Sequence, residues 1–303
     1  MTFGNIYDLA VSLGCTAEFD VPMSEYTTFK IGGNAKLMIT PDSDGHLAEI
    51  VRECKNLGVK PMIIGNGSNM LISDKGLDTV VINMCGCNCN IAYLGDGIIE
   101  CDSGVTMSRL CNFALEKELT GLEFAFGIPG TAGGAAYMNA GAYGGEMKDV
   151  LVSCMHIDLD GNFGELKASE LKLGYRTSAY EHNGYIITKL ILKLQPGIKA
   201  DIKAKMQELL QRRKDKQPLE FPSAGSTFKR PEGYFAGALI EECGLKGATV
   251  GGAQVSEKHA GFVINKGGAT SADVMNLIKL VQDTVLEKTG VMLEPEVRLI
   301  EEI

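Results

Sequence analysis

Apolar residues recur at intervals of three and four residues in several segments, which is the spacing of one face of a helix. The clearest case predicts a helix from about residue 272 to 287, with Thr270 and Asp273 at its start and Gly290 after its end. Its apolar stripe consists of Val274, Leu277, Ile278, Val281 and Val285. Similar patterns or polar helical composition predict helices over residues 44–57, 106–118 and 201–216.

Short β-branched runs, separated by Gly, Pro and Asp, predict the strands. They cover residues 26–40 with a break at Gly32-Gly33, 61–65, 79–83, 91–94, 98–103, 151–159, 185–195 and 297–300. We expect a helical lead-in over residues 1–25 and neither helix nor strand over residues 122–150. Strands and helices do not alternate regularly after residue 83, so the pattern favours an α+β fold with segregated sheets over a doubly wound one.

Composition narrows the class of protein. Of the 303 residues 45% are hydrophobic, enough for a real core, and the net charge of −9 disfavours binding to nucleic acid or to an anionic membrane. The nine cysteines form no regular framework, which is typical of reduced thiols. Neither a secretory leader nor an apolar run of the ~20 residues that cross a bilayer is apparent, so we expect a cytoplasmic protein.

Two glycine-rich segments carry the first chemical signal. Residues 64–71 (IGNGSNML) follow a β-branched strand, and successive N–H groups in such a loop can form an anion-binding nest, although a plain hairpin turn remains an alternative. Residues 127–146 contain seven glycines and five alanines in twenty positions. A flexible linker would carry more Ser, Lys or Glu, so this small and apolar composition indicates buried backbone around a large flat ligand.

At these segments the chain resembles the UDP-N-acetylenolpyruvoylglucosamine reductase family, which belongs to a broader vanillyl-alcohol-oxidase-like group of flavin-binding proteins. Four more segments match in the same order: TTFKIGGNA (27–35), YRTS (175–178), SAGSTFKRP (223–231) and LEPEVRLI (293–300). The resemblance implies a two-subdomain FAD-binding region of the PCMH type and a C-terminal α+β substrate domain. The short connection from Thr177 to Gly184 resembles the branch of the family that lacks a Tyr-bearing loop.

The resemblance also implies three parts of the chain. Residues 1–83 would form the first FAD-binding subdomain, with the strand in 293–303 returning to it, and residues 84–197 the second. Residues 201–292 would bind the substrate.

The implied reaction is the NADPH-dependent reduction of UDP-N-acetylglucosamine enolpyruvate to UDP-N-acetylmuramate in peptidoglycan precursor synthesis. The resemblance implies that reduced FAD gives hydride to C3, that Ser226 gives a proton to C2, and that Arg176 and Glu296 hold the substrate carboxylate. It assigns FAD to Ile64, Gly65, Asn66, Gly67, Ser68, Asn69, Leu71, Pro129, Gly130, Thr131, Gly133, Gly134, Asn139, Gly141 and Tyr143. It assigns the substrate to Tyr175, Arg213, Lys216 and Lys229.

The residue types suit this chemistry, because negative charge that develops on C2 and the carboxylate needs cations and hydrogen-bond donors nearby. A guanidinium can bind a carboxylate bidentately, and like charge raises the pKa of a Glu beside it. Each residue also has a plainer interpretation. Arg176 could be a surface Arg, Glu296 a strand-edge Glu, Ser226 a turn Ser, and Arg213 and Lys216 the solvated face of a helix.

Some features depart from the pattern. Residue 230 is Arg, where some relatives have an Asn that touches substrate. Cys85, Cys87 and Cys89 lack a second ligand pair and the four histidines are scattered, so we expect no metal site. The alternatives are another FAD-dependent oxidase or dehydrogenase of the flavin-binding group, or a flavin-binding protein without catalysis. We expect a monomer.

Overall fold

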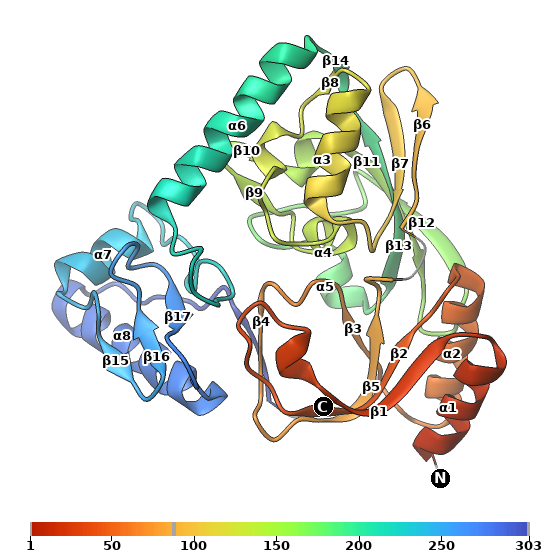
Figure 1. Ribbon diagram of the computed structural model, residues 1–303, viewed down its shortest axis with the longest axis horizontal. Helices are drawn as coiled ribbons and strands as arrows, with labels where there is room; N and C mark the ends of the chain where they lie inside the picture. Colours follow the sequence, from red (N-terminus) through yellow and green to blue (C-terminus); the bar gives the residue numbers. More distant parts are fainter. Residues whose placement is uncertain (1, 87–88, 302–303) are drawn as a thin grey trace. The chain divides into compact units, whose positions relative to one another are not determined.

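The computed structural model describes residues 2–86 and 89–301 (Figure 1). Contacts divide the chain into two compact units. The first unit contains Met1–Phe19, Leu37–Asn66 and Thr79–Arg212, and the second contains Asp20–Lys36, Gly67–Asp78 and Arg213–Ile303. The chain therefore passes from one unit to the other several times, and the division into three consecutive parts stays a prediction.

One part of the first unit is a four-stranded sheet beside two helices that pack against each other (Figure 1). The strand order is β1-β2-β5-β3, and β3 pairs with β5 in parallel. The elements are α1 (Thr2–Ser12), β1 (Thr16–Pro22), β2 (Asn34–Thr40), α2 (Asp44–Asn56), β3 (Met62–Ile64) and β5 (Leu77–Asn83). Of the apolar positions at helical spacing in this segment, Leu47, Ile50, Val51 and Cys54 are buried as expected, and Leu57, which follows the helix, is partly buried.

Strand β1 replaces part of the helical lead-in that the sequence predicted over residues 1–25, so that prediction is wrong beyond Ser12. The sequence did carry a strand signal here, because Ala17, Phe19 and Val21 alternate with polar residues. Only Val21 of this strand is buried. Predicted strand 26–40 shortens to β2, and a 3₁₀ turn, η1 (Met23–Glu25), precedes it.

The rest of the first unit is built on an antiparallel five-stranded sheet in the order β12-β11-β13-β7-β6. Its strands are β6 (Ile91–Gly95), β7 (Ile98–Asp102), β11 (Leu151–Ile157), β12 (Phe163–Lys167) and β13 (Ile186–Lys193). Helices α3 (Met107–Glu116), α4 (Ala132–Tyr137) and α5 (Tyr180–Asn183) accompany it, and α4 contacts β13 and β7. Strands β8 (Leu119–Thr120) and β14 (Gln195–Pro196) form a small separate pair.

The segment 122–150, expected to be neither helix nor strand, contains regular structure after all. It holds α4, the short antiparallel pair β9 (Gly141–Ala142) and β10 (Gly145–Glu146), and the 3₁₀ turns η2 (Glu123–Ala125) and η3 (Met147–Asp149). Glycine is unfavourable inside a helix, so α4 is not predictable from propensity. The Thr131 hydroxyl caps it by accepting a hydrogen bond from the Gly134 N–H at 3.3 Å.

The second unit has a small antiparallel sheet, β15 (Thr249–Val250), β16 (Ala253–Val255) and β17 (Val263–Asn265), and α8 contacts two of its strands. Helix α8 (Ser271–Thr289) has the predicted ends: a capping box between Thr270 and Asp273, and Gly290 with φ 73°. Helix α7 (Ala236–Glu242) contacts α8, and α6 (Lys199–Lys216) leads into this unit. Among the described helices, none is both long and apolar enough to cross a membrane.

A parallel pair of strands closes the second unit. Strand β18 (Arg298–Ile300) lies beside β4 (Met70–Ile72), with Leu299 opposite Leu71. Strand β4 lies within residues 1–83, and the predicted return of the last strand to a first FAD-binding subdomain stays a prediction. The core of the unit joins Phe29, Ile31 and Leu71 to the buried side of α8.

Candidate active site

In the first unit, the end of β3 and the second glycine-rich segment touch. A Cβ built on Gly65 would lie 2.5 Å from the Thr131 Oγ1 atom, so no larger residue fits there unless Thr131 moves. The Asn66 amide donates a hydrogen bond of 2.6 Å to the Pro129 carbonyl. Five predicted cofactor residues, Ile64 to Asn66, Pro129 and Thr131, therefore belong to one local structure.

The start of α4 lies against Ser103, the residue that follows β7. The Gly133 N–H donates to the Ser103 carbonyl at 2.8 Å, and a Cβ on Gly133 would lie 2.7 Å from the Ser103 Cβ. The Ser103 hydroxyl is buried and has no hydrogen-bond partner among the described residues. A buried hydroxyl without a partner is costly unless a ligand or water satisfies it. Sequence reasoning missed Ser103, whose signal was only a Ser-Gly pair at the end of a predicted strand.

Asn139 holds several backbone segments together. Its side chain is 1% exposed and its φ is 44°, a left-handed conformation that Asn tolerates better than most residues. The amide nitrogen donates to Glu146 Oε2 at 2.5 Å and to the Gly174 carbonyl at 2.9 Å. The amide oxygen accepts from the Lys148 N–H at 2.9 Å. Both amide hydrogens are thus used inside the protein, which leaves only the oxygen for a cofactor.

Arg176 lies beside the β9–β10 hairpin. Its Nη2 atom donates to the Gly141 carbonyl at 3.2 Å, and its guanidinium lies 5.2 Å from the centre of the Tyr175 ring. Both Arg176 and Tyr143 have positive φ, 58° and 54°, which is strained for such residues and is frequent at functional sites. The structure therefore brings Gly141 and Arg176 together, while the Tyr143 ring stacks under Arg212 at 5.0 Å.

These features fit a dinucleotide such as FAD. The backbone at Gly65 and Gly133 approaches its neighbours so closely that side chains are excluded, and Ser103 offers an unsatisfied buried hydroxyl. The remaining predicted cofactor residues are Gly67, Ser68, Asn69 and Leu71, which belong to the second unit. Gly67 has φ 55°, and a Cβ there would lie 2.1 Å from the Tyr26 carbonyl oxygen, so only glycine fits.

In the second unit, backbone pairing places Thr227, the residue after Ser226, opposite Glu296. The N–H groups of Lys229 and Glu296 donate to the carbonyls of Glu294 and Thr227, both at 2.8 Å. This ladder pairs residues 227–229 with residues 294–297. The Asn69 amide donates to the Glu296 carbonyl at 3.1 Å, so a predicted cofactor residue meets the predicted catalytic pair. Ser226 is exposed and Glu296 half-buried.

The predicted substrate residues differ in their surroundings. Lys229 Nζ forms an ion pair of 2.5 Å with Glu294 Oε1 and so carries its own counter-charge. Arg213 is 8% exposed and donates to Gln217 Oε1 at 3.3 Å, whereas Lys216 is exposed. Arg213 is therefore no member of a solvated helix face. Arg230 lies over the Phe235 ring, 4.1 Å from its centre.

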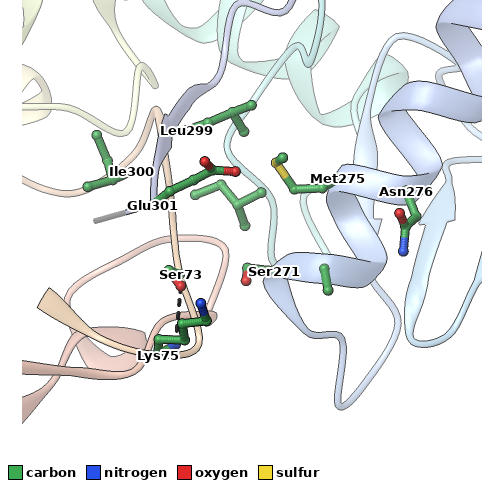
Figure 2. Close-up of a pocket in the computed structure, with 10 residues that line it drawn as sticks. Ser73, Lys75, Ser271, Met275, Asn276, Leu299, Ile300 and Glu301 are labelled. Atoms are coloured by element: carbon green, nitrogen blue, oxygen red, sulfur yellow. Dashed lines mark hydrogen bonds between the residues drawn. The ribbon is translucent and has the colours of Figure 1, made fainter. Parts of the chain in front are cut away.

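A cavity of about 560 Å³ lies within the second unit (Figure 2). Residues of β4 and the loop after it, of α8 and of β18 surround it, among them Ser73, Lys75, Ser271 and Met275. Leu71 is the predicted cofactor residue in its wall, and neither Ser226 nor Glu296 lines it. The cavity is thus separate from the predicted catalytic pair.

The cysteine cluster that the sequence singled out is described only in part, because Cys87 lies outside the described residues. Burial raises the pKa of the Cys85 thiol to about 11, with Cys89 a smaller contributor. A thiol with such a pKa is protonated at neutral pH and weakly nucleophilic. Its role stays open.

The chain matches known proteins over nearly its whole length. Residues 35–167 match the FAD binding domain family, and residues 217–300 match the C-terminal domain of UDP-N-acetylenolpyruvoylglucosamine reductase. A reductase of that name from Clostridium botulinum strain Hall is 50% identical over 283 residues, 93% of this chain and 92% of the relative. The Clostridium tetani reductase is 48% identical over 280 residues, 92% and 91% of the two chains.

Solved structures agree. The UDP-N-acetylenolpyruvylglucosamine reductase of Thermus caldophilus has a TM-score of 0.79 at 34% identity, covering 94% of this chain and 98% of that one. The 6-hydroxy-D-nicotine oxidase of Arthrobacter nicotinovorans is similar in fold alone: TM-score 0.50, 15% identity, 61% of this chain and 43% of the other. Given these matches, the chain belongs to the UDP-N-acetylenolpyruvoylglucosamine reductase family.

Proposed function

We propose that this protein reduces UDP-N-acetylglucosamine enolpyruvate to UDP-N-acetylmuramate, with NADPH as reductant and FAD as cofactor, in peptidoglycan precursor synthesis. The proposal is carried by the 50% identity to proteins named for this reductase activity, together with the backbone ladder that pairs Thr227, next to Ser226, with Glu296. The FAD binding domain match over residues 35–167 supports the cofactor.

The cofactor would be held by the residues at the end of β3, by the segment from Pro129 to Gly134 around the start of α4, and by Asn69. When bound, FAD supplies the chemistry of accepting a hydride from NADPH and passing it to the substrate. The protein would shape the cofactor pocket and exclude water from it. Close backbone at Gly65 and Gly133 admits a flat ligand where side chains would block it.

Ser226 would donate the proton to C2. A serine hydroxyl is a weak acid, far from the ideal pKa of a general acid, but a carbanionic enolate is a base strong enough to take its proton. Its place next to the ladder supports this role, because the pairing of Thr227 with Glu296 fixes the backbone directly after Ser226. Glu296 would hold the substrate carboxylate, which requires that one of the two acids be protonated.

Arg176 would polarise the substrate carboxylate. A guanidinium stays charged at every physiological pH and has five N–H donors, of which the Gly141 carbonyl takes one. The strained backbone of Arg176 and its contact with the Tyr175 ring support a functional role for its side chain. Arg213 and Lys216 would bind the diphosphate of the UDP-sugar, with Lys229 and Tyr175 as further substrate contacts.

We further propose a division of labour along the chain. Residues 1–83 and 84–197 would hold FAD, and residues 201–292 would hold the substrate. The proposed state is a cytoplasmic monomer. A net charge of −9 disfavours binding to nucleic acid or to anionic membrane surfaces. Light scattering coupled to size exclusion tests the monomer, since a mass of 32.5 kDa is expected.

An anaerobic half-reaction experiment tests the function. The purified protein should show flavin absorption, lose it when NADPH is added, and regain it when UDP-N-acetylglucosamine enolpyruvate follows. Bleaching without recovery would reject the substrate and favour another oxidoreductase of the flavin-binding group. A flavin spectrum that NADPH leaves unchanged would reject the reductase and favour a passive flavin binder.

A further inference from the structure

Three side chains of different chemistry converge near the N-terminus of the first unit. Cys15, Asp42 and His46 each offer one ligand atom, and these three atoms lie within 4.8 Å of one another. They come from separate segments: the turn after α1, the loop between β2 and α2, and the first turn of α2. Asp42 and His46 lie four residues apart, whereas Cys15 is distant along the chain and joins them only through the fold.

The local backbone fixes each of the three positions. Gly14 takes φ 84° and turns the chain after α1, and the Cys15 N–H donates to the Ala10 carbonyl at 3.0 Å. Ser43 caps α2 by accepting from the His46 N–H at 3.2 Å. His46 Nδ1 lies 2.5 Å from Asp42 Oδ1. Cys15 is 7% exposed, whereas the side chains of His46 and Asp42 are 32% and 56% exposed, so the cluster opens to solvent on one side.

The charges at this position favour a cation. Burial raises the pKa of the Cys15 thiol, and the nearby carboxylates of Asp42 and Glu49 raise it further. The same two carboxylates that oppose a thiolate attract a divalent ion, and coordination to a metal deprotonates a thiol outright. A thiolate and one carboxylate together neutralise a charge of +2.

We propose that Cys15, Asp42 and His46 bind a divalent transition-metal ion, for which Zn²⁺ is the best match. Thiolate, imidazole and carboxylate are the ligands that Zn²⁺ uses, whereas Mg²⁺ and Ca²⁺ require oxygen ligands alone. Water, or the Glu49 carboxylate after a rotamer change, would complete a tetrahedral site. The ion would fasten the turn after α1 to the start of α2.

The geometry requires only small adjustments. Zinc bond lengths of about 2.0–2.3 Å in a tetrahedral site place the ligand atoms roughly 3.4–3.6 Å apart. The His46–Asp42 pair must therefore open from 2.5 Å, and the widest separation, at most 4.8 Å, must close by about 1 Å. The partly exposed side chains of Asp42 and His46 have room for such movements.

The test measures metal content and affinity on the FAD-loaded protein. To exclude the other cysteine cluster, Cys85, Cys87 and Cys89 are first replaced by Ser. This background protein is equilibrated with Zn²⁺, separated from free metal and analysed by mass spectrometry of the metal. We expect one Zn²⁺ per chain, and no Mg²⁺ in a parallel experiment. Co²⁺ should give long-wavelength absorption of a tetrahedral thiolate site, beyond the flavin bands.

Single replacements then locate the ion. Cys15→Ser, His46→Gln and Asp42→Asn should each weaken Zn²⁺ binding at least about tenfold. Loss of a residue that only hydrogen-bonds to a metal ligand already lowers metal affinity by about that factor. His182→Gln, an exposed histidine elsewhere in the first unit, is the matched control and should bind as the background does. Zn²⁺ should also raise Tm in the background and not in His46→Gln. Absence of bound Zn²⁺, or binding that these replacements leave unchanged, would overturn the proposal.

Discussion

Replacing Asn139 by Ala removes three hydrogen bonds from a side chain that is 1% exposed. The bond to the Glu146 carboxylate is worth about 1.5–3 kcal/mol and each of the other two about 0.5–1.5 kcal/mol, so their sum is about 2.5–6 kcal/mol. Ala in a left-handed backbone adds on the order of 1 kcal/mol. Water can reach the partly exposed Glu146 after the change, so we expect the low end, a loss of about 3.5 kcal/mol.

Urea unfolding of the FAD-free protein measures this loss. The chain has no Trp, so far-UV circular dichroism is the appropriate signal. Asn139→Gly is the matched control, because it removes the same bonds but restores backbone freedom at φ 44°. It should be more stable than the Ala variant by about 1 kcal/mol.

The same experiment separates two roles for Asn139. If it acts as an internal tether, stability falls in the absence of FAD and cofactor affinity falls as a consequence. A variant that unfolds within about 0.5 kcal/mol of the parent, while FAD binding weakens strongly, would refute the tether. Asn139 would then be a direct cofactor ligand whose internal bonds contribute little.

Three further predictions concern other positions. Gly133→Ala should destabilise the FAD-free protein by more than about 1 kcal/mol, because its Cβ would lie 2.7 Å from Ser103 Cβ. The control Gly134→Ala, in the same helix, has its nearest contact at 3.4 Å and should be neutral or stabilising. Equal effects of the two substitutions would contradict the close approach at Gly133. Burial lowers the pKa of His156 below its ordinary value near 6.5, so the unfolded chain binds the extra proton first and stability should fall as pH drops from 7 to 5. In His156→Gln the free energy of unfolding, measured in urea at each pH, should depend less steeply on pH, by the uptake of up to one proton. An unchanged slope would show that His156 does not cause the loss of stability at low pH. Ser226→Ala should slow substrate reduction about 10²–10⁴-fold and leave flavin reduction by NADPH intact, as measured by stopped-flow absorbance. Ser226→Cys should retain part of the rate of substrate reduction, and the control Ser223→Ala should retain all of it. Equal losses in both half-reactions would rule out Ser226 as the proton donor.

Periodic segments were predictable from the sequence because their own residues decide them. The stripes of α2 and α8 are buried as expected, and the cap residues of α8 do what their types suggest. Strand β1 was missed although Ala17, Phe19 and Val21 alternate with polar residues, and helix α4 was not predictable because it is rich in glycine. Both owe their structure to neighbours distant in sequence, namely β2 in the sheet and the Ser103 backbone beside Gly133.

The candidate site divides in the same way. The glycine-rich segments were visible because composition alone marks close backbone approach, and Gly65, Gly67 and Gly133 indeed lie too near other atoms for a side chain. By residue type alone, Ser226 and Glu296 look like an ordinary turn Ser and an edge Glu, and only the family resemblance pointed to them in the sequence. The ladder between their segments forms across distant parts of the chain. Asp42 and His46 have helical spacing, but nothing in the sequence indicated that Cys15 joins them.

The pairing of β4 with β18 also affects how the protein is made. Strand β4 leaves the ribosome early, whereas its partner is synthesised only after α8. During that interval β4 has an open edge and the core around Leu71 lacks α8. Pairing between such distant segments folds slowly, and exposed strand edges promote aggregation. The nascent chain is therefore expected to depend on chaperones, and expression at low temperature should increase the yield of folded protein.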